Sequence, residues 1–193
     1  MNKIFLFLIF TLLPTGAYAH TGALGGFQAG LSHPVLGLDH LLAMISVGVV
    51  SAQLGGRAMW LIPSTFVLVM AIGGLLGMAD VGLGAVEVGI ALSVVVLGLA
   101  IANISRIAAF VIYGFVFLFA TFHGYAHGLE IPQLATSWAY VGGFMLGTVG
   151  LHLLGVGIGH FASKIPNGPT ALKYAGAIVA GMGLHILAEI AGI

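Results

Sequence analysis

Six long apolar stretches follow one another along this chain, and they constrain its fold more than any other feature. Each is long enough to cross the hydrocarbon core of a bilayer, about 30 Å thick, as a single α-helix. Only short connections separate them, so no part of the chain is left to form a soluble domain. We therefore predict an all-α membrane protein with one domain of six transmembrane helices. The expected helices are residues 34–54, 58–79, 82–103, 107–128, 135–161 and 170–191.

The scarcity of charged residues supports a membrane location. Only 10 of the 193 residues are Asp, Glu, Lys or Arg, which is 5% of the chain, whereas about 25% is usual in soluble domains. So few charges argue against a soluble enzyme, a disordered chain and a partner of nucleic acids. The chain has no cysteine, which excludes disulfides and thiolate metal sites. We expect the lipid bilayer to be the main partner, and a homo-oligomer is left open.

The N-terminus has the pattern of a secretory signal peptide. A short positive segment precedes an apolar segment of ten residues, which is too short to span a bilayer. Residues 17–19, Ala-Tyr-Ala, match the small-x-small pattern of a signal-peptidase site. We predict cleavage after Ala19, which removes residues 1–19, makes His20 the mature N-terminus and leaves residues 20–193 as the transmembrane domain. The alternative is an uncleaved first transmembrane helix.

Basic and acidic residues alternate between successive connections. Lysine and arginine lie in or beside the first, third and fifth connections, at Arg57, Arg106, Lys164 and Lys173. The other two connections contain Asp80 and Glu130, which we expect to be solvated loop acids. Because basic loops of membrane proteins stay in the cytoplasm, we predict that both termini lie outside the cytoplasmic (inner) membrane. A cleaved signal peptide requires the same orientation.

Ionisable side chains within the expected helices point to function, because they are costly in a bilayer and usually face the interior of a helix bundle. At 1.5 Å per residue, five of them lie on the order of 8 Å below the outer ends of four different helices. They are Asp39, His40, Glu87, His123 and His185. Three imidazoles and two carboxylates at one depth suit a divalent cation such as nickel, cobalt or zinc.

Further polar side chains extend this layer towards the two membrane surfaces. They are His20, His33, His127 and Glu189, expected at the mouth, His152, expected deeper, and His160, expected to be solvated near the cytoplasmic end. His33 and His40 are seven residues apart, so they are predicted to share one face of a helix that has Pro34 in its first turn. His123 and His127 are four residues apart and share a face for the same reason.

Several of these residues also have a purely structural interpretation. Asp39 and His40 can form an internal ion pair that locks the first helix. His123 and His127 can be interfacial histidines that are hydrated among the lipid headgroups. His152 can be a hydrogen-bonding residue between helices. The residue types alone do not decide between these roles and metal ligation.

Two sequence motifs resemble those of the HupE/UreJ family. The first is a histidine, five residues and Asp-His within residues 33–44, followed by the segment 51–56. The second is residues 122–128, Phe-His-Gly-Tyr-Ala-His-Gly. The signal peptide, the six spans and the overall length also match, so the resemblance covers essentially the whole chain.

The resemblance implies uptake of nickel, and in some members of cobalt, for hydrogenases and ureases. Downstream maturation proteins of hydrogenase or urease would then receive the metal. By resemblance, functional roles fall on His33, Asp39, His40, Glu87, His123 and His127. His152 and His185 rest on the depth argument and not on the family pattern.

We therefore expect a secondary transporter, not an enzyme, that carries Ni²⁺ inward across the inner membrane. Co²⁺ and Zn²⁺ are other candidate ions, and no organic cofactor is expected. The chain has no glycine-rich Walker loop, so ATP hydrolysis within it is not expected. Two alternatives remain at this point. One is a metal-binding or maturation partner that carries nothing across the membrane, and the other is a membrane cytochrome with haem b between two histidines.

Overall fold

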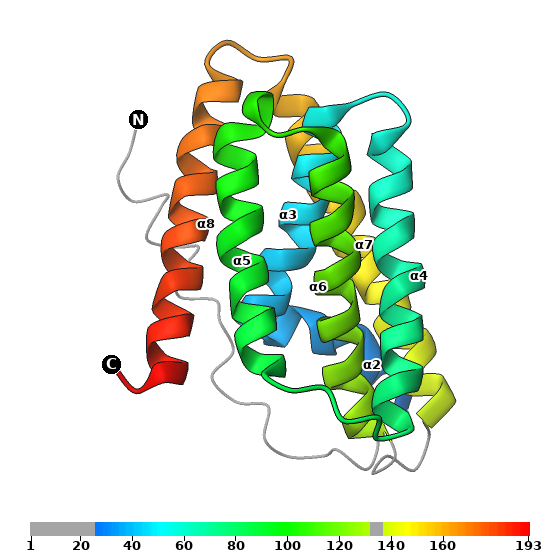
Figure 1. The fold of residues 1–193 in the computed structure, drawn as a ribbon. Helices are drawn as coiled ribbons and strands as arrows, with labels where there is room; N and C mark the ends of the chain where they lie inside the picture. Colours follow the sequence, from blue (N-terminus) through cyan, green and yellow to red (C-terminus); the bar gives the residue numbers. More distant parts are fainter. Residues whose placement is uncertain (1–25, 132–136) are drawn as a thin grey trace, which may run out of the picture.

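The computed structural model describes residues 26–131 and 137–193, and this part of the chain is a helical bundle (Figure 1). The elements are α2 (Gly26–Leu36), α3 (Leu38–Leu54), α4 (Ala58–Met78), α5 (Val86–Asn103), the short 3-10 helix η1 (Ile104–Arg106), α6 (Ala109–Glu130), α7 (Ser137–Ala162) and α8 (Gly168–Ala191). The all-α class is thereby confirmed. The expected signal peptide, residues 1–19, and His20 lie outside the described residues.

Five helices, α4 to α8, are each long and apolar enough to cross a membrane. Their ends fall within four residues of the predicted boundaries. The helices α2 and α3 pass the same test only together, as a pair bent by 81°. The described residues therefore provide up to six membrane spans, as predicted, but the first span is broken.

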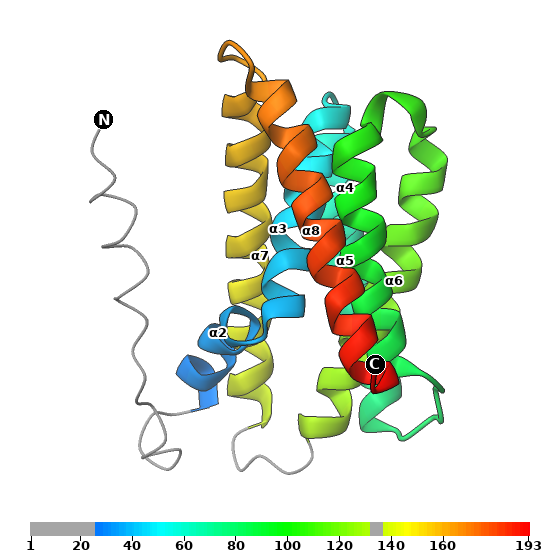
Figure 2. The same ribbon diagram turned by 90° about the vertical axis from the view of Figure 1, so that its left-hand side faces the viewer.

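The break in the first span corrects the prediction of one straight helix over residues 34–54. Pro34 lies inside α2 instead of opening a helix, and α2 ends two residues later at Leu36. A proline lacks the backbone N–H and crowds the carbonyl four residues before it, so a helix rarely continues far beyond it. Gly37 is extended, with φ −88° and ψ 119°, and α3 begins directly after it. Figure 2 shows α2 turned away from the axis of α3 and lying beside α7.

Close helix contacts at glycines hold the bundle together. In α6, a Cβ atom at Gly124 would collide with the carbonyl oxygen of Met70, and one at Gly128 with that of Gly74, both in α4. Small residues allow such backbone approach in membrane helices, where lipid provides no hydrophobic driving force for association. This contact sets the position of the last turns of α6, which contain two of the candidate histidines.

The two ends of the bundle differ in charge. Helix α2, the C-terminal ends of α6 and α8 and the first turn of α5 lie at one end (Figure 1). The connections that contain Arg57, Arg106 and Lys164 lie at the other end. In the described part of the chain, these basic residues thus gather at the end opposite α2, as the predicted topology requires.

Candidate metal-binding site

Two histidines and one glutamate converge where α2 meets the end of α6. His33 Nε2 lies 3.6 Å from Glu130 Oε2, and His127 Nδ1 lies 3.5 Å from the same oxygen. One ligand atom from each of the three side chains lies within 4.8 Å of the other two. The side chains of His33 and Glu130 are 36% and 55% exposed, whereas that of His127 is only 5% exposed. Imidazole nitrogen and carboxylate oxygen together suit a divalent transition metal, and this group is open on one side, where His33 and Glu130 are accessible.

Glu130 is a site residue that the sequence analysis missed. It was expected to be a solvated loop acid, but it is the last residue of α6 and faces His127. The sequence feature that could have revealed it is its spacing from His127, because residues three apart on a helix share a face. The pattern His-x-x-Glu at residues 127–130 therefore predicts this pair once α6 is extended to Glu130.

Asp39 and His40 form a tight internal pair in the first turn of α3. The His40 backbone N–H donates to Asp39 Oδ1 at 2.8 Å, and His40 Nδ1 lies 3.0 Å from the same oxygen. A carboxylate can only accept, so His40 Nδ1 carries the proton. The other ring nitrogen, Nε2, is buried and has no hydrogen-bond partner in the described part of the chain. The Asp39–His40 contact foreseen as a structural alternative is therefore present, and with a neutral imidazole the lone pair of His40 lies on Nε2.

Four imidazole rings form a continuous line from the open group into the bundle. The ring centroids are 4.8 Å apart for His33 and His127, 4.5 Å for His127 and His40, and 4.6 Å for His40 and His123. His33, at one end of the line, is partly exposed, His127 and His40 are buried, and His123, at the other end, is fully buried. The prediction that His33 and His40 share one helix face is wrong, because the chain bends at Gly37 between them. Both instead contact His127.

His152 lies on α7 and is 1% exposed, with both ring nitrogens unpartnered among the described residues. Within residues 26–131 and 137–193 it forms no interhelical hydrogen bond, which was its structural alternative. The ring centroid of Phe66 in α4 lies 5.1 Å from that of His152 and 5.8 Å from that of His123. Phe66, which sequence reasoning also missed, thus contacts both rings and lies between the end of the imidazole line and His152.

Two members of the predicted layer, His185 and Glu87, do not join this line. His185 in α8 lies 3.6 Å from Glu189 of the same helix, and their side chains are 75% and 66% exposed. Glu87, in the first turn of α5, is also exposed. The expectation that both His185 and Glu87 face the interior is therefore wrong. Depth along a helix does not determine the direction in which a side chain points.

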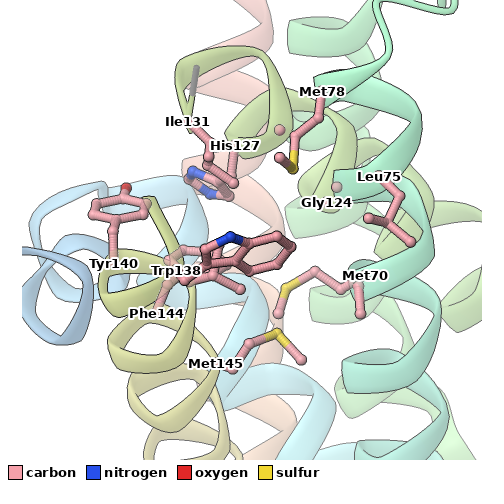
Figure 3. Close-up of a pocket in the computed structure, with 14 residues that line it drawn as sticks. Met70, Leu75, Met78, Gly124, His127, Ile131, Trp138, Tyr140, Phe144 and Met145 are labelled. Atoms are coloured by element: carbon pink, nitrogen blue, oxygen red, sulfur yellow. The ribbon is translucent and has the colours of Figure 1, made fainter. Parts of the chain in front are cut away.

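A cavity of about 180 Å³ lies between α4, α6 and α7, beside His127 (Figure 3). Figure 3 shows Met70, Met78 and Met145 directed into it. Its lining is almost entirely apolar, so it offers a hydrated cation few polar contacts.

The chain is similar to known proteins over nearly its whole length. A family model described as HupE / UreJ protein matches residues 8–186. The chain is also 42% identical, over 187 residues, to Protein HupE of Rhizobium leguminosarum bv. viciae, and the match covers 92% of this chain and 98% of that protein. No solved structure matches. The resemblance inferred from the two sequence motifs is thereby confirmed.

Proposed function

Because the chain belongs to the HupE / UreJ family, we propose that it is a secondary transporter that takes up Ni²⁺ through its line of histidines. The observation that carries the proposal is the line of four contacting imidazole rings. Four imidazoles from α2, α3 and α6 run from a partly exposed group to a fully buried ring in a bundle of membrane-spanning helices. Ionisable groups within membrane spans typically mark ion pathways.

The first step is capture at the open group. His33 and His127 supply imidazole nitrogens, and Glu130 supplies negative charge. Because His127 contacts both His33 and His40, it passes the ion from the entrance to the buried rings. Asp39 stays paired with His40, so its charge offsets that of the ion without requiring Asp39 to be a direct ligand. Beyond His123 the path continues past Phe66 to His152.

The orientation follows from charge. The basic connections at the end opposite α2 would face the cytoplasm, so the open group at α2 would face outside the inner membrane. A membrane potential of 100 mV contributes about 2.3 kcal/mol per elementary charge, or about 4.6 kcal/mol for a divalent cation moving inward. Uptake therefore needs no ATP hydrolysis.

The ligand types support nickel or cobalt without separating the two. Nitrogen and oxygen ligands bind Co²⁺, Ni²⁺ and Zn²⁺, and raw affinity favours Cu²⁺ over all of them. The imidazole contacts disfavour the haem alternative for His40 and His123, because axial ligands lie on opposite faces of the macrocycle and these rings touch each other.

The decisive experiment is uptake of trace nickel by cells that express this chain, with excess cobalt, zinc or magnesium as competitors. His40→Ala is the test variant. His160→Ala is its control, because His160 is a half-buried histidine in the last turn of α7, at the end of the bundle opposite the open group. We expect His40→Ala to abolish uptake, His160→Ala to retain it, and cobalt to compete most strongly. Absence of uptake by the wild-type chain, with the protein confirmed in the membrane, would contradict transport and favour a metal-binding partner.

A further inference from the structure

We propose that Ser93 is a positioning residue that holds the His123 ring in one tautomer and so keeps a ring nitrogen free for metal. The inference rests on the proposed function for its effect on uptake, but the tautomer itself is a property of the protein without metal. Ser93 lies in α5 and is fully buried, as is His123 in α6. The Ser93 hydroxyl lies 2.9 Å from His123 Nε2.

The hydrogen bonds of the Ser93 hydroxyl decide where the His123 proton lies. The hydroxyl donates to the backbone carbonyl of Ile90 at 2.6 Å. A hydroxyl has one proton, and a carbonyl oxygen can only accept. With that proton committed to Ile90, the Ser93 oxygen accepts from His123, which requires the proton on Nε2.

Protonation at Nε2 leaves His123 Nδ1 with a free lone pair. This nitrogen is buried and has no hydrogen-bond partner among the described residues. In the adjacent ring, Asp39 imposes the opposite tautomer on His40 and leaves Nε2 unpartnered. Two rings in contact, with centroids 4.6 Å apart, therefore each keep one buried nitrogen without a hydrogen-bond partner among the described residues. On the proposed function, these two nitrogens are the ones offered to the ion.

Partners of this kind are common behind metal ligands. A ligating histidine usually donates its second N–H to a carboxylate, a carbonyl or water, which orients the ring and increases its basicity. Loss of such a partner typically costs about 10–100-fold in metal affinity or activity. Asp39 and Ser93 occupy this role for His40 and His123, one through a carboxylate and the other through a hydroxyl with a committed proton.

The first test reads the tautomer directly, by nitrogen NMR of the metal-free full-length protein with ¹⁵N-labelled histidine in detergent. Comparison with His123→Gln assigns the His123 signals. We expect a protonated Nε2 and an unprotonated Nδ1 in the wild type, a mixture of tautomers in Ser93→Ala, and the wild-type pattern in Ser93→Thr. A proton on Nδ1 in the wild type, or an unchanged pattern in Ser93→Ala, would overturn the proposal.

The second test measures nickel uptake at equal amounts of protein in the membrane. Ser93→Ala should lower uptake at limiting nickel by about 10–100-fold. Ser51→Ala is the matched control, because Ser51 is fully buried and its hydroxyl donates to a carbonyl three residues earlier, like that of Ser93. Unlike Ser93, its hydroxyl forms no hydrogen bond with a histidine in the described part of the chain. We expect Ser51→Ala to transport like the wild type, and equal losses in both variants would reduce Ser93 to a structural role.

The two tests separate the two proposals. If the wild-type chain carries no nickel but the NMR pattern is as expected, transport fails and the tautomer stands. If the wild type transports but Ser93→Ala transports equally well, the role of Ser93 fails and transport stands. Should Ser93→Ala not accumulate, the wild-type NMR pattern alone still decides the tautomer.

Discussion

Two His–Glu pairs in this protein have almost the same nitrogen–oxygen separation but very different surroundings. His127 and Glu130 in α6 lie 3.5 Å apart, and His185 and Glu189 in α8 lie 3.6 Å apart. The His127 side chain is 5% exposed and contacts His33 and His40, whereas that of His185 is 75% exposed. In the described part of the chain, no third metal-ligating side chain joins the α8 pair. Helical spacing thus makes a pair, but a second helix is needed to make a site.

The largest expected difference is between the two histidines of these pairs. His127→Ala removes a ligand that contacts both neighbouring rings, so nickel uptake should fall by more than the roughly 10–100-fold that loss of a supporting partner costs. His185→Ala should leave uptake unchanged. Initial rates of nickel uptake, normalised to protein in the membrane, measure both effects. Equal loss in the two variants would remove the distinction between the pairs.

Substitution of the glutamates in the two pairs should show the same contrast, with a smaller loss of nickel uptake. Glu130→Gln keeps the shape of the side chain but removes the charge that faces His33 and His127. We expect uptake at limiting nickel to fall about tenfold, with less effect at saturating nickel. Glu189→Gln provides the control on α8, and a comparable loss there would show that α8 contributes to capture.

Acidification should act through the histidine line. An imidazole must be neutral to bind a metal, and histidine ordinarily titrates near pH 6.5. Protons therefore compete with nickel as the pH falls, but burial favours the neutral form of an imidazole, so uptake should decline only at a pH clearly below about 6.5. The His185→Ala variant should show the same profile as the wild type. A profile with no decline on the acid side, at constant membrane potential, would count against histidine ligation.

The smallest expected effect concerns the bend between α2 and α3. A Cβ atom at Gly37 would lie 3.0 Å from Asp39 Oδ1 and 3.3 Å from His40 Nδ1. The backbone of Gly37 is in a region open to alanine, so Gly37→Ala should disturb only the Asp39–His40 pair. We expect a several-fold loss of uptake with normal accumulation in the membrane.

Gly181→Ala is the corresponding control on α8, because a Cβ atom there has no neighbour within 4 Å. Its uptake should equal that of the wild type. If Gly37→Ala also transports normally, the Asp39–His40 geometry is less critical than its short contacts indicate.

Much of the fold could be predicted from the sequence, because the location of each membrane span depends only on where the apolar stretches lie along the chain. Apolar length identifies a membrane span, and the five helices α4 to α8 fall where hydropathy placed them. The two motifs were enough to identify the family, and the family model and a relative confirm it. The candidate ligands His33, His40, His123 and His127 were also found this way, since histidines inside apolar spans are rare and conspicuous.

The composition of the site depended on tertiary structure, for a physical reason. Residue spacing determines how deep a side chain lies along a helix axis, but helix packing determines the direction in which it points. Membrane helices are apolar on nearly all sides, so their sequences contain little of the amphipathic pattern that reveals the buried face. The sequence therefore determined the spans and the depth of the ionisable groups. Only helix packing decided the composition of the site. The packing of α2, α3 and α6, with the bend at Gly37, brings Glu130 to the histidines, whereas the packing of α5 and α8 leaves Glu87 and His185 exposed.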